Sequence, residues 1–360
     1  MSLSIAIVGF PNVGKSTLFN ALLKQQVALA ANYPFATIEP NTGIAQVPDD
    51  RLAVLAQVVN TTVIKPATVE FVDIAGLVKG ASQGAGLGNQ FLSHIRETSA
   101  ICHVLRAFTD ADVIREGAVE PAEDLAIIRM ELQLADLATL EKQKEPKGMA
   151  KPEEKERWQV VTHFKKIIED GEMLSKQSLT AEQKTVAQEL NLLSIKPEIV
   201  ALNVSETELG KADALVAELA PKLQVAPTQI VVISAKIESE LASLDEADQA
   251  LFLEELGLKN SGLERLAAVA YSTLGLQSFL TAGEVEVRAW TISKGISAPE
   301  AAGVIHTDFT KKFIKANIAS YQDFVEFNGW KGVRESGKLR MEGRDYIMQE
   351  GDIVEFAIGA

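Results

Sequence analysis

The stretch LSIAIVGFPNVGKSTLFNALL, residues 3–23, decides the fold. A short apolar, β-branched run over residues 3–8 leads into a loop, and the apolar positions of residues 18–23 have helical spacing. The loop, residues 9–17, fits the pattern G-x-x-x-x-G-K-[ST], in which glycines let backbone N–H groups surround a phosphate chain. The stretch therefore predicts a strand, a phosphate-binding loop and a helix.

The polar residues of this loop each have an expected role. Lys15 places its charge on the β- and γ-phosphates, and Ser16 offers its hydroxyl to Mg²⁺. The N-terminus of the following helix adds partial positive charge. A glycine-rich turn without function is the alternative, which the flanking strand and helix disfavour. The predicted nucleotide-binding residues of the loop are Asn12, Val13, Gly14, Lys15, Ser16 and Thr17.

A second apolar strand over residues 68–72 ends in Asp73-Ile74-Ala75-Gly76. Asp73 is placed to hold Mg²⁺ through water, and the N–H of Gly76 to reach the γ-phosphate. Residues 32–41 contain two prolines and cannot form one regular helix, and we expect Thr37 there to be a further Mg²⁺ ligand. The alternative for Thr37 is an ordinary strand threonine. Five glycines between residues 76 and 88 predict a loop suited to a nucleotide switch.

Two further apolar strands predict where the base is read. Residues 198–202 lead into Asn203-Val204-Ser205-Glu206, at the place where guanine-specific P-loop proteins carry N-K-x-D. Glu206 is longer than the Asp that accepts both guanine donors. Val204 lacks the long aliphatic stem with which a Lys packs over the base. We therefore expect ATP to be preferred. The alternative is that Asn203 and Glu206 only cap a helix. The predicted base-reading residues are Asn203, Val204, Glu206 and the intact Ser234, Ala235 and Lys236.

The order of patterns predicts an α/β protein with three parts. Residues 123–144 and 153–170 predict two amphipathic helices joined by a Pro/Gly turn, and Thr180 is expected to cap a third helix. Beyond residue 277, the ranges 285–290, 324–327 and 353–358 are predicted strands and 298–304 a helix, which together fit a β-grasp domain. The predicted domains are a P-loop NTPase domain (1–120 and 196–276), a helical coiled-coil insert (121–195) and a β-grasp domain (277–360).

Composition narrows the function classes. The 360 residues are 47% hydrophobic, carry a net charge of −14, and include one cysteine and four histidines. This disfavours a generally basic nucleic-acid coat, a disulfide framework and a structural zinc site. Because no stretch reaches about 18 apolar residues, we expect a cytoplasmic protein with no membrane partner. Cations near the C-terminus are either RNA contacts or a solvated face: Lys311, Lys312, Lys315, Lys331, Arg334, Lys338, Arg340 and Arg344.

The chain resembles the YchF family of Obg-like ATPases, which are TRAFAC-class P-loop NTPases. The resemblance rests on residues 9–17, 32–41, 71–88, 89–98, 203–206, 289–291 and 303–308, and it extends along essentially the whole chain. It implies a GTPase-type (OBG-type) domain, a coiled-coil insert and a C-terminal TGS domain. It also implies a slow, Mg²⁺-dependent ATPase that prefers ATP to GTP, associates with the ribosome or its RNA, and regulates translation or a stress response. We expect mostly monomer, with a nucleotide-dependent dimer left open.

The residue that positions the attacking water is not evident. Ras-like enzymes have a Gln after the glycine of D-x-x-G, whereas this chain has Leu77. Many members of the family resembled have a His at the place of Arg115. Asn12 resembles the residue that holds a monovalent cation in potassium-activated relatives, so K⁺ is a second expected cofactor. The catalytic candidates are therefore Lys15, Gly76 and Asn12. A GTPase of the same fold and a nucleotide-held binding module with incidental hydrolysis are the alternatives.

Overall fold

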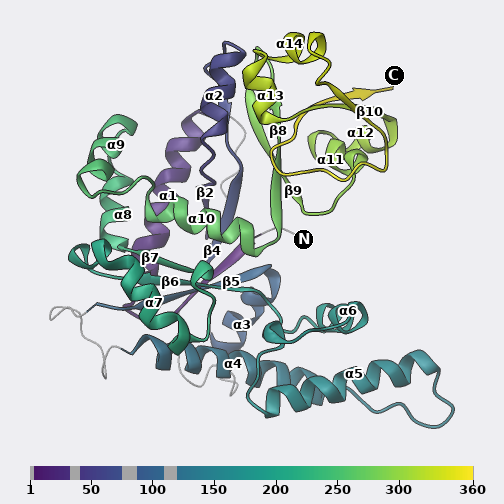
Figure 1. The fold of residues 1–360 in the computed structure, drawn as a ribbon. Coiled ribbons are helices and arrows are strands. Elements are labelled where there is room, and N and C mark those ends of the chain that lie inside the picture. Colours follow the sequence, from purple (N-terminus) through teal and green to yellow (C-terminus); the bar gives the residue numbers. More distant parts are fainter. Residues whose placement is uncertain (1–3, 33–40, 75–86, 109–119, 360) are drawn as a thin grey trace. The chain divides into compact units, whose positions relative to one another are not determined.

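The computed structural model describes residues 4–32, 41–74, 87–108 and 120–359. The chain divides into two compact units (Figure 1). The first unit comprises residues 1–44 and 70–269, and the second comprises residues 45–69 and 270–360. The helical pattern that was predicted as an insert lies within the first unit. The second unit includes a segment far from the C-terminus in sequence.

The first unit contains a six-stranded sheet in the order β2-β4-β1-β5-β6-β7. β1 pairs in parallel with β4 and β5, and the pairs β5–β6 and β6–β7 are also parallel. Every residue of β1, β5, β6 and β7 is buried, which explains their continuous apolar sequences. The strands are β1 (Ser4–Val8), β2 (Thr42–Gln46), β4 (Thr68–Asp73), β5 (Ala100–Arg106), β6 (Glu198–Asn203) and β7 (Ile230–Ile233).

Helices alternate with these strands, as expected for parallel connections. α1 starts at Lys15, where Leu18 N–H donates to the Gly14 carbonyl (3.0 Å). α3 starts at Leu87, earlier than the predicted Phe91, and so includes Gly88. The elements are α1 (Lys15–Asn32), α3 (Leu87–Glu97), η3 (Glu206–Lys211), α7 (Ala212–Leu223), η4 (Pro227–Gln229), α8 (Ala235–Leu241), α9 (Glu246–Glu255) and α10 (Gly262–Thr273).

The predicted helical hairpin is present in the first unit. It consists of α4 (Pro121–Glu141) and α5 (Pro152–Glu169), and each begins with a proline at the first helical position. A short turn, η2 (Leu174–Lys176), precedes α6 (Ala181–Glu189). Thr180 caps α6 as predicted. Its hydroxyl accepts from Gln183 N–H (3.2 Å), and the side-chain oxygen of Gln183 accepts from Thr180 N–H. The hairpin has an apolar cluster of its own, including Leu140, Val161, Phe164 and Ile168.

The second unit contains a mixed six-stranded sheet in the order β11-β10-β12-β8-β9-β3. β8–β9, β10–β12 and β10–β11 are antiparallel, whereas β12–β8 and β3–β9 are parallel. α11 packs on one apolar face of the sheet, in agreement with the β-grasp expectation. The elements are α2 (Arg51–Val58), β3 (Ile64–Lys65), β8 (Leu276–Ala282), β9 (Val287–Ser293), α11 (Ala298–Ile305), α12 (Thr307–Lys312), β10 (Phe313–Ala319), α13 (Tyr321–Glu326), α14 (Trp330–Glu335), β11 (Arg340–Glu342) and β12 (Ile353–Ile358).

Residues 45–69 belong to the second unit, although the sequence boundaries assigned them to the nucleotide domain. β3 extends the mixed sheet by pairing with β9. Arg51 anchors the segment by binding Asp49 with two nitrogens (2.7 and 2.8 Å) and Glu350 with one (2.6 Å). A two-residue strand and a partner 299 residues away leave no local signal, which explains why this grouping was not predicted.

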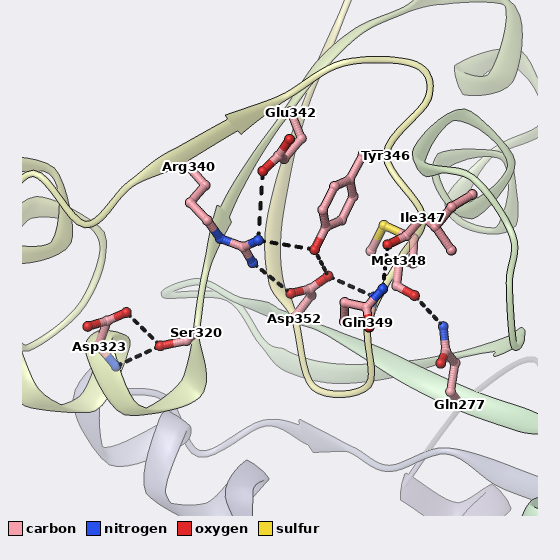
Figure 2. Close-up of polar contacts among 10 residues, drawn as sticks. All are labelled: Gln277, Ser320, Asp323, Arg340, Glu342, Tyr346, Ile347, Met348, Gln349 and Asp352. Carbon is pink, nitrogen blue, oxygen red and sulfur yellow. Dashed lines mark hydrogen bonds and ion pairs between the residues drawn. The ribbon is translucent and has the colours of Figure 1, made fainter.

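The predicted strand over residues 324–327 is wrong. These residues lie in and just after α13, which Ser320 caps by accepting from Asp323 N–H (3.1 Å) while donating to the Asp323 carboxylate (2.7 Å; Figure 2). This pair satisfies one free N–H of the first turn, that of Asp323, and the cap outweighs the strand preference of the aromatic and β-branched residues that follow.

Three further observations concern site classes considered from composition. Cys102 is fully buried in β5, and burial raises the pKa of its thiol to about 12. Within residues 4–359, apart from the ranges omitted above, no three His, Cys, Asp or Glu side chains are grouped to hold a metal ion. No helix in the same part of the chain is sufficiently long and apolar to cross a membrane.

Candidate nucleotide-binding site

The predicted nucleotide residues meet at one edge of the parallel sheet. Ile7 of β1 lies opposite Asp73 of β4, and Asn203 of β6 lies opposite Ile233 of β7. Since parallel strands end together, the loop after β1, the carboxylate of Asp73, Asn203 and the Ser234-Ala235 turn all lie at the carboxyl edge. Ligands bind at this edge in open α/β sheets.

The phosphate loop requires its glycines for steric reasons. Gly14 has a φ of +99°, and a Cβ there would overlap the side-chain nitrogen of Asn203. A Cβ on Gly9 would overlap the backbone oxygen of Val104. Asn12 has a φ of +61°, in the left-handed region that Asn tolerates better than most residues. The loop conformation therefore depends on the two glycines that the motif specifies and on Asn12, which the motif leaves open.

Asn203 holds three segments of the site together. Its side-chain nitrogen donates to the Val13 carbonyl (2.9 Å), and its side-chain oxygen accepts from Ala235 N–H (2.9 Å). Asn203 ends β6, Val13 lies in the phosphate loop, and Ala235 starts α8, so one buried amide fixes all three. These bonds show that Asn203 positions the loops around it, and its predicted contact with the base stays a prediction.

Lys15 and Asp73 form the charged centre of the site. The Lys15 ammonium donates to the Phe10 carbonyl (2.7 Å), within its own loop. Burial lowers the pKa of Lys15, a shift that the charge of Asp73 opposes. Burial also raises the pKa of Asp73, and the charge of Lys15 opposes that shift. A bound anion would stabilise the charged form of Lys15, and a bound cation would stabilise the charged form of Asp73.

The predicted base-reading residues divide into buried and exposed groups. Val204 is only 2% exposed and belongs to the apolar core of the first unit, so it offers little surface for a base. Ser234 and Ala235 are also buried. The side chains of Glu206 and Lys236 are exposed, and they are the two of this set that solvent reaches.

Neither Asn203 nor Glu206 forms the cap of η3, the helix that starts at Glu206. The cap of η3 is formed by Ser205 and Glu208, whose side chains are joined by a 2.6 Å hydrogen bond. Glu208 also accepts from Ser205 N–H (3.1 Å), so both members of the cap are already satisfied by one another. Glu206 is therefore not needed for the cap.

The oxygen donors available here suit Mg²⁺. Ser16 is exposed at the start of α1, and Asp73 ends β4 at the same sheet edge. Mg²⁺ is commonly held by one or two protein oxygens, with water and phosphate oxygens completing its shell. A hydroxyl and a single carboxylate therefore fit the ion without a larger cluster of acidic side chains.

Several predicted site residues lie outside the described residues: Thr37, Gly76, Leu77, Arg115 and most of the glycine-rich loop. One residue that sequence reasoning missed is Arg106, which is 2% exposed at the end of β5 and lies opposite Asn203. Its Nε donates to the Phe108 carbonyl (3.0 Å), and its guanidinium lies 4.5 Å from the centre of the Phe108 ring. A cation at the end of an apolar strand was the available signal.

Comparison with known proteins identifies the family. Residues 4–130 match the MMR_HSR1 model, described as a 50S ribosome-binding GTPase. Residues 276–359 match the YchF-GTPase_C model, described as a protein of unknown function (DUF933). The chain is 46% identical over 363 residues to the Bacillus subtilis (strain 168) protein named ribosome-binding ATPase YchF, covering 99% of each. The chain belongs to the YchF family.

Two other relatives support the assignment to the YchF family. The Escherichia coli O157:H7 protein named ribosome-binding ATPase YchF is 47% identical over 364 residues, again covering 99% of each chain. The solved structure of the Schizosaccharomyces pombe YchF GTPase has a TM-score of 0.87 and 36% identity, and covers 99% of this chain and 98% of that one. The fold described above is therefore that of the YchF family, along the whole chain.

Proposed function

We propose that this protein is a slow, Mg²⁺-dependent ATPase that acts as a switch on the ribosome. The observation that carries the proposal is the Asn203 bridge, which fixes the phosphate loop beside the β7–α8 turn, at the sheet edge that also carries Lys15 and Asp73. The names of the curated relatives, ribosome-binding ATPases, supply the expected nucleotide and partner. A role in translation or a stress response would follow from that partner.

Binding would begin with an exchange at Lys15. Its ammonium leaves the Phe10 carbonyl and takes phosphate oxygens as partners, while loop N–H groups hold the phosphate chain. Ser16, Asp73 and Thr37 would hold Mg²⁺, which supplies charge neutralisation at the phosphates. The N–H of Gly76 would bind the γ-phosphate oxygen.

Hydrolysis then consists of attack by water on the γ-phosphorus with cleavage of its bond to the bridging oxygen, which yields ADP and phosphate. Leu77 cannot orient the water, and a slow rate follows from that. Asn12 would hold K⁺ beside the phosphates, where a fixed cation stabilises developing negative charge. Replacement of Asn12 should then abolish any potassium activation, and an unchanged response would exclude Asn12 as the ligand.

Base preference is proposed to depend on Glu206. Its exposed carboxylate can accept from the adenine amine, whereas Val204 is buried and contributes no stacking surface. The intact Ser234-Ala235-Lys236 turn and the name of the S. pombe relative, a GTPase, favour guanine as the second candidate. Replacing Val204 with Lys is a poor test, because it would bury a charge in the core.

The test compares Asn203→Ala with Glu206→Ala by calorimetric titration with ATP and GTP in Mg²⁺ and K⁺. Loss of the Asn203 bridge should weaken both nucleotides, by roughly ten- to hundredfold, because the loops lose their fixed geometry. Loss of Glu206 should reduce the ATP-to-GTP affinity ratio by roughly five- to tenfold. An unchanged ratio in Glu206→Ala would show that Glu206 does not read the base.

The remaining expectations stay proposals. A nucleotide-held binding module would bind ribosomes equally in an analogue-locked form and in a hydrolysis-dead variant. The cytoplasmic location, the monomeric state with a nucleotide-dependent dimer, and the three domain boundaries (1–120 with 196–276, 121–195 and 277–360) are proposed on the same basis.

A further inference from the structure

A buried carboxylate of α8 caps the first turn of α10. Glu238 lies three residues after Ala235 in α8 and is 3% exposed. Its carboxylate accepts from Gly262 N–H (2.7 Å) and Leu263 N–H (3.1 Å). These N–H groups belong to the start of α10, where a helix leaves its donors without partners of its own. Glu238 therefore joins α8, the helix that follows the Ser234-Ala235 turn, to the start of α10.

A second contact joins the same turn of α10 to β7. The Arg265 guanidinium donates to the carbonyl of Val232 (2.9 Å), the second-last residue of β7. Burial raises the pKa of Glu238, and the two donated N–H bonds and the charge of Arg265 oppose that shift. β7 ends just before the Ser234-Ala235 turn and α8 begins within it. The start of α10 therefore contacts the elements on both sides of the turn.

Gly262 allows α10 to approach this closely. A Cβ at Gly262 would lie 2.6 Å from a carboxylate oxygen of Glu238 and 2.8 Å from a side-chain carbon of Ile233, the last residue of β7. Both separations are too short for a carbon atom, so a side chain here would push α10 away from β7 and α8. The close contact between α10 and the two elements thus depends on a residue without a side chain.

Buried hydrogen bonds connect Glu238 with the phosphate loop through the same turn. Glu238 N–H donates to the Ser234 carbonyl (3.0 Å). Ala235, the next residue, donates its N–H to the Asn203 side chain, and that amide donates to the Val13 carbonyl. All five residues are buried. The turn is therefore held by Asn203 on the side of the phosphate loop and by Glu238 on the side of α10.

We propose that Glu238 is a positioning residue for the nucleotide base. By capping α10, its carboxylate holds the Ser234-Ala235 turn and the exposed Lys236 that follows it in the place where they contact a base. The effect is confined to the base, because the phosphate loop keeps its bond from Asn203. The assignment of this turn to the base rests on the proposed function, whereas the contacts between α8, β7 and α10 do not.

The experiment compares two ligands by calorimetric titration of the full-length protein with Mg²⁺. ATP contains a base, and inorganic tripolyphosphate has a similar phosphate chain without one. Glu238→Ala should weaken ATP binding by roughly tenfold, because the turn loses its support, and leave tripolyphosphate binding unchanged. Unchanged ATP affinity in Glu238→Ala would overturn the proposal. Equal losses for the two ligands would also overturn it, because the effect would then not concern the base.

The matched control removes a different cap from the same turn of α10. Glu264 accepts from Ser261 N–H (2.8 Å) and Ser261 Oγ accepts from Glu264 N–H (3.1 Å), so this pair lies within the start of α10 itself. Glu264→Ala should bind both ligands as the wild type does. The same loss of ATP affinity in Glu264→Ala and Glu238→Ala would overturn the proposal, because it would reflect only the stability of α10.

Gly262→Ala provides a second test in which the carboxylate of Glu238 is retained. The added Cβ should displace α10 from Glu238 and Ile233, so the same selective loss of ATP affinity is expected. Gly343→Ala is the control, because no atom lies within 4 Å of a Cβ added there, and it should bind ATP normally. Unchanged ATP affinity in Gly262→Ala would contradict the role of this contact.

Titration of the wild-type protein separates this proposal from the proposed function. A wild type that binds ATP no more tightly than tripolyphosphate would contradict the proposed base site, and the role of Glu238 with it. A wild type that binds ATP more tightly, together with a Glu238→Ala variant that keeps this preference in full, would overturn the role of Glu238 alone.

Discussion

The two six-stranded sheets place their functional groups in different ways. In the parallel sheet, the groups lie at strand ends and in one loop, so backbone geometry at Gly14 and the buried amide of Asn203 define the site. In the mixed sheet, charged side chains lie along strands and turns, and pairing decides which are available: Arg340 is engaged by Asp352, whereas Arg344 is not paired with an acid among the described residues. A motif therefore predicts the nucleotide-binding site, while a count of charges does not predict which cations of the mixed sheet are paired.

The largest effect should follow from breaking the backbone geometry of the phosphate loop. Gly14→Ala adds a Cβ that overlaps Asn203 at a residue with a φ of +99°, so ATP affinity should fall by roughly a hundredfold or more. The matched control is Gly148→Ala, which also has a positive φ (+68°) but has no atom within 4 Å of the added Cβ. Calorimetric titration with ATP should show normal affinity for the control, and equal losses would contradict the steric argument.

A substitution at the opposite edge of the parallel sheet, where β6 begins, should affect stability rather than nucleotide binding. Glu198 begins β6, accepts two bonds from Arg129 (2.5 and 3.0 Å) and lies 3.4 Å from His103. Burial by itself would raise the pKa of Glu198 above its ordinary value of 4.5. These partners instead lower this pKa to about 2. Glu198→Gln should therefore reduce the free energy of unfolding at pH 7 by about 3 kcal/mol, with ATP affinity unchanged.

The stability that Glu198 contributes should decrease at low pH. A depressed carboxyl pKa contributes stability that is complete above about pH 4.5 and is lost as the pH falls toward about 2. The difference between wild type and Glu198→Gln in urea unfolding should shrink over that range. Glu218→Gln, which breaks an exposed pair with Lys222, is the control and should leave the unfolding curve unchanged. A constant difference between wild type and Glu198→Gln from pH 7 to pH 3 would contradict the assignment.

A smaller effect is expected from the network of the mixed sheet. Asp352 is buried and accepts from Arg340 (3.1 Å), the Tyr346 hydroxyl (2.9 Å) and Gln349 N–H (2.9 Å; Figure 2). Asp352→Asn should cost about 1–3 kcal/mol of unfolding free energy, because an amide cannot accept all three bonds. Urea unfolding measures this loss, and ATP affinity should be unchanged at temperatures where the variant is folded. An unfolding free energy equal to that of the wild type would contradict the role of Asp352 in this network.

Local signals predicted the parts of the fold that depend on neighbouring residues. The buried strands, the α4–α5 hairpin and the cap of α6 by Thr180 follow from patterns within a few residues, and the structure confirms them. The strand predicted over residues 324–327 failed because one cap, Ser320 with Asp323, outweighed strand preference. The grouping of residues 45–69 with the second unit was not predicted, because Arg51 and Glu350 are distant in sequence.

The nucleotide-binding site also combines features that local sequence predicts with features that depend on residues distant in the chain. The phosphate loop and Asp73 were predicted with their positions, because the motif itself states the geometry. The sequence placed Asn203 correctly but did not show that its amide joins Val13 to Ala235, since both partners are remote in the chain. The burial of Val204 was also missed, because a valine after a strand is compatible with either a core or a surface position.

The most direct test of the proposed function is the equilibrium affinity of the wild-type protein for ATP and for GTP, measured side by side with Mg²⁺ in potassium buffer. ATP should bind more tightly, and Lys15→Ala should lose tight binding of both nucleotides, while Lys24→Ala, an exposed lysine on α1, should bind normally. Tighter binding of GTP would contradict the assignment of base preference to Glu206. Normal affinity in Lys15→Ala would contradict the site itself.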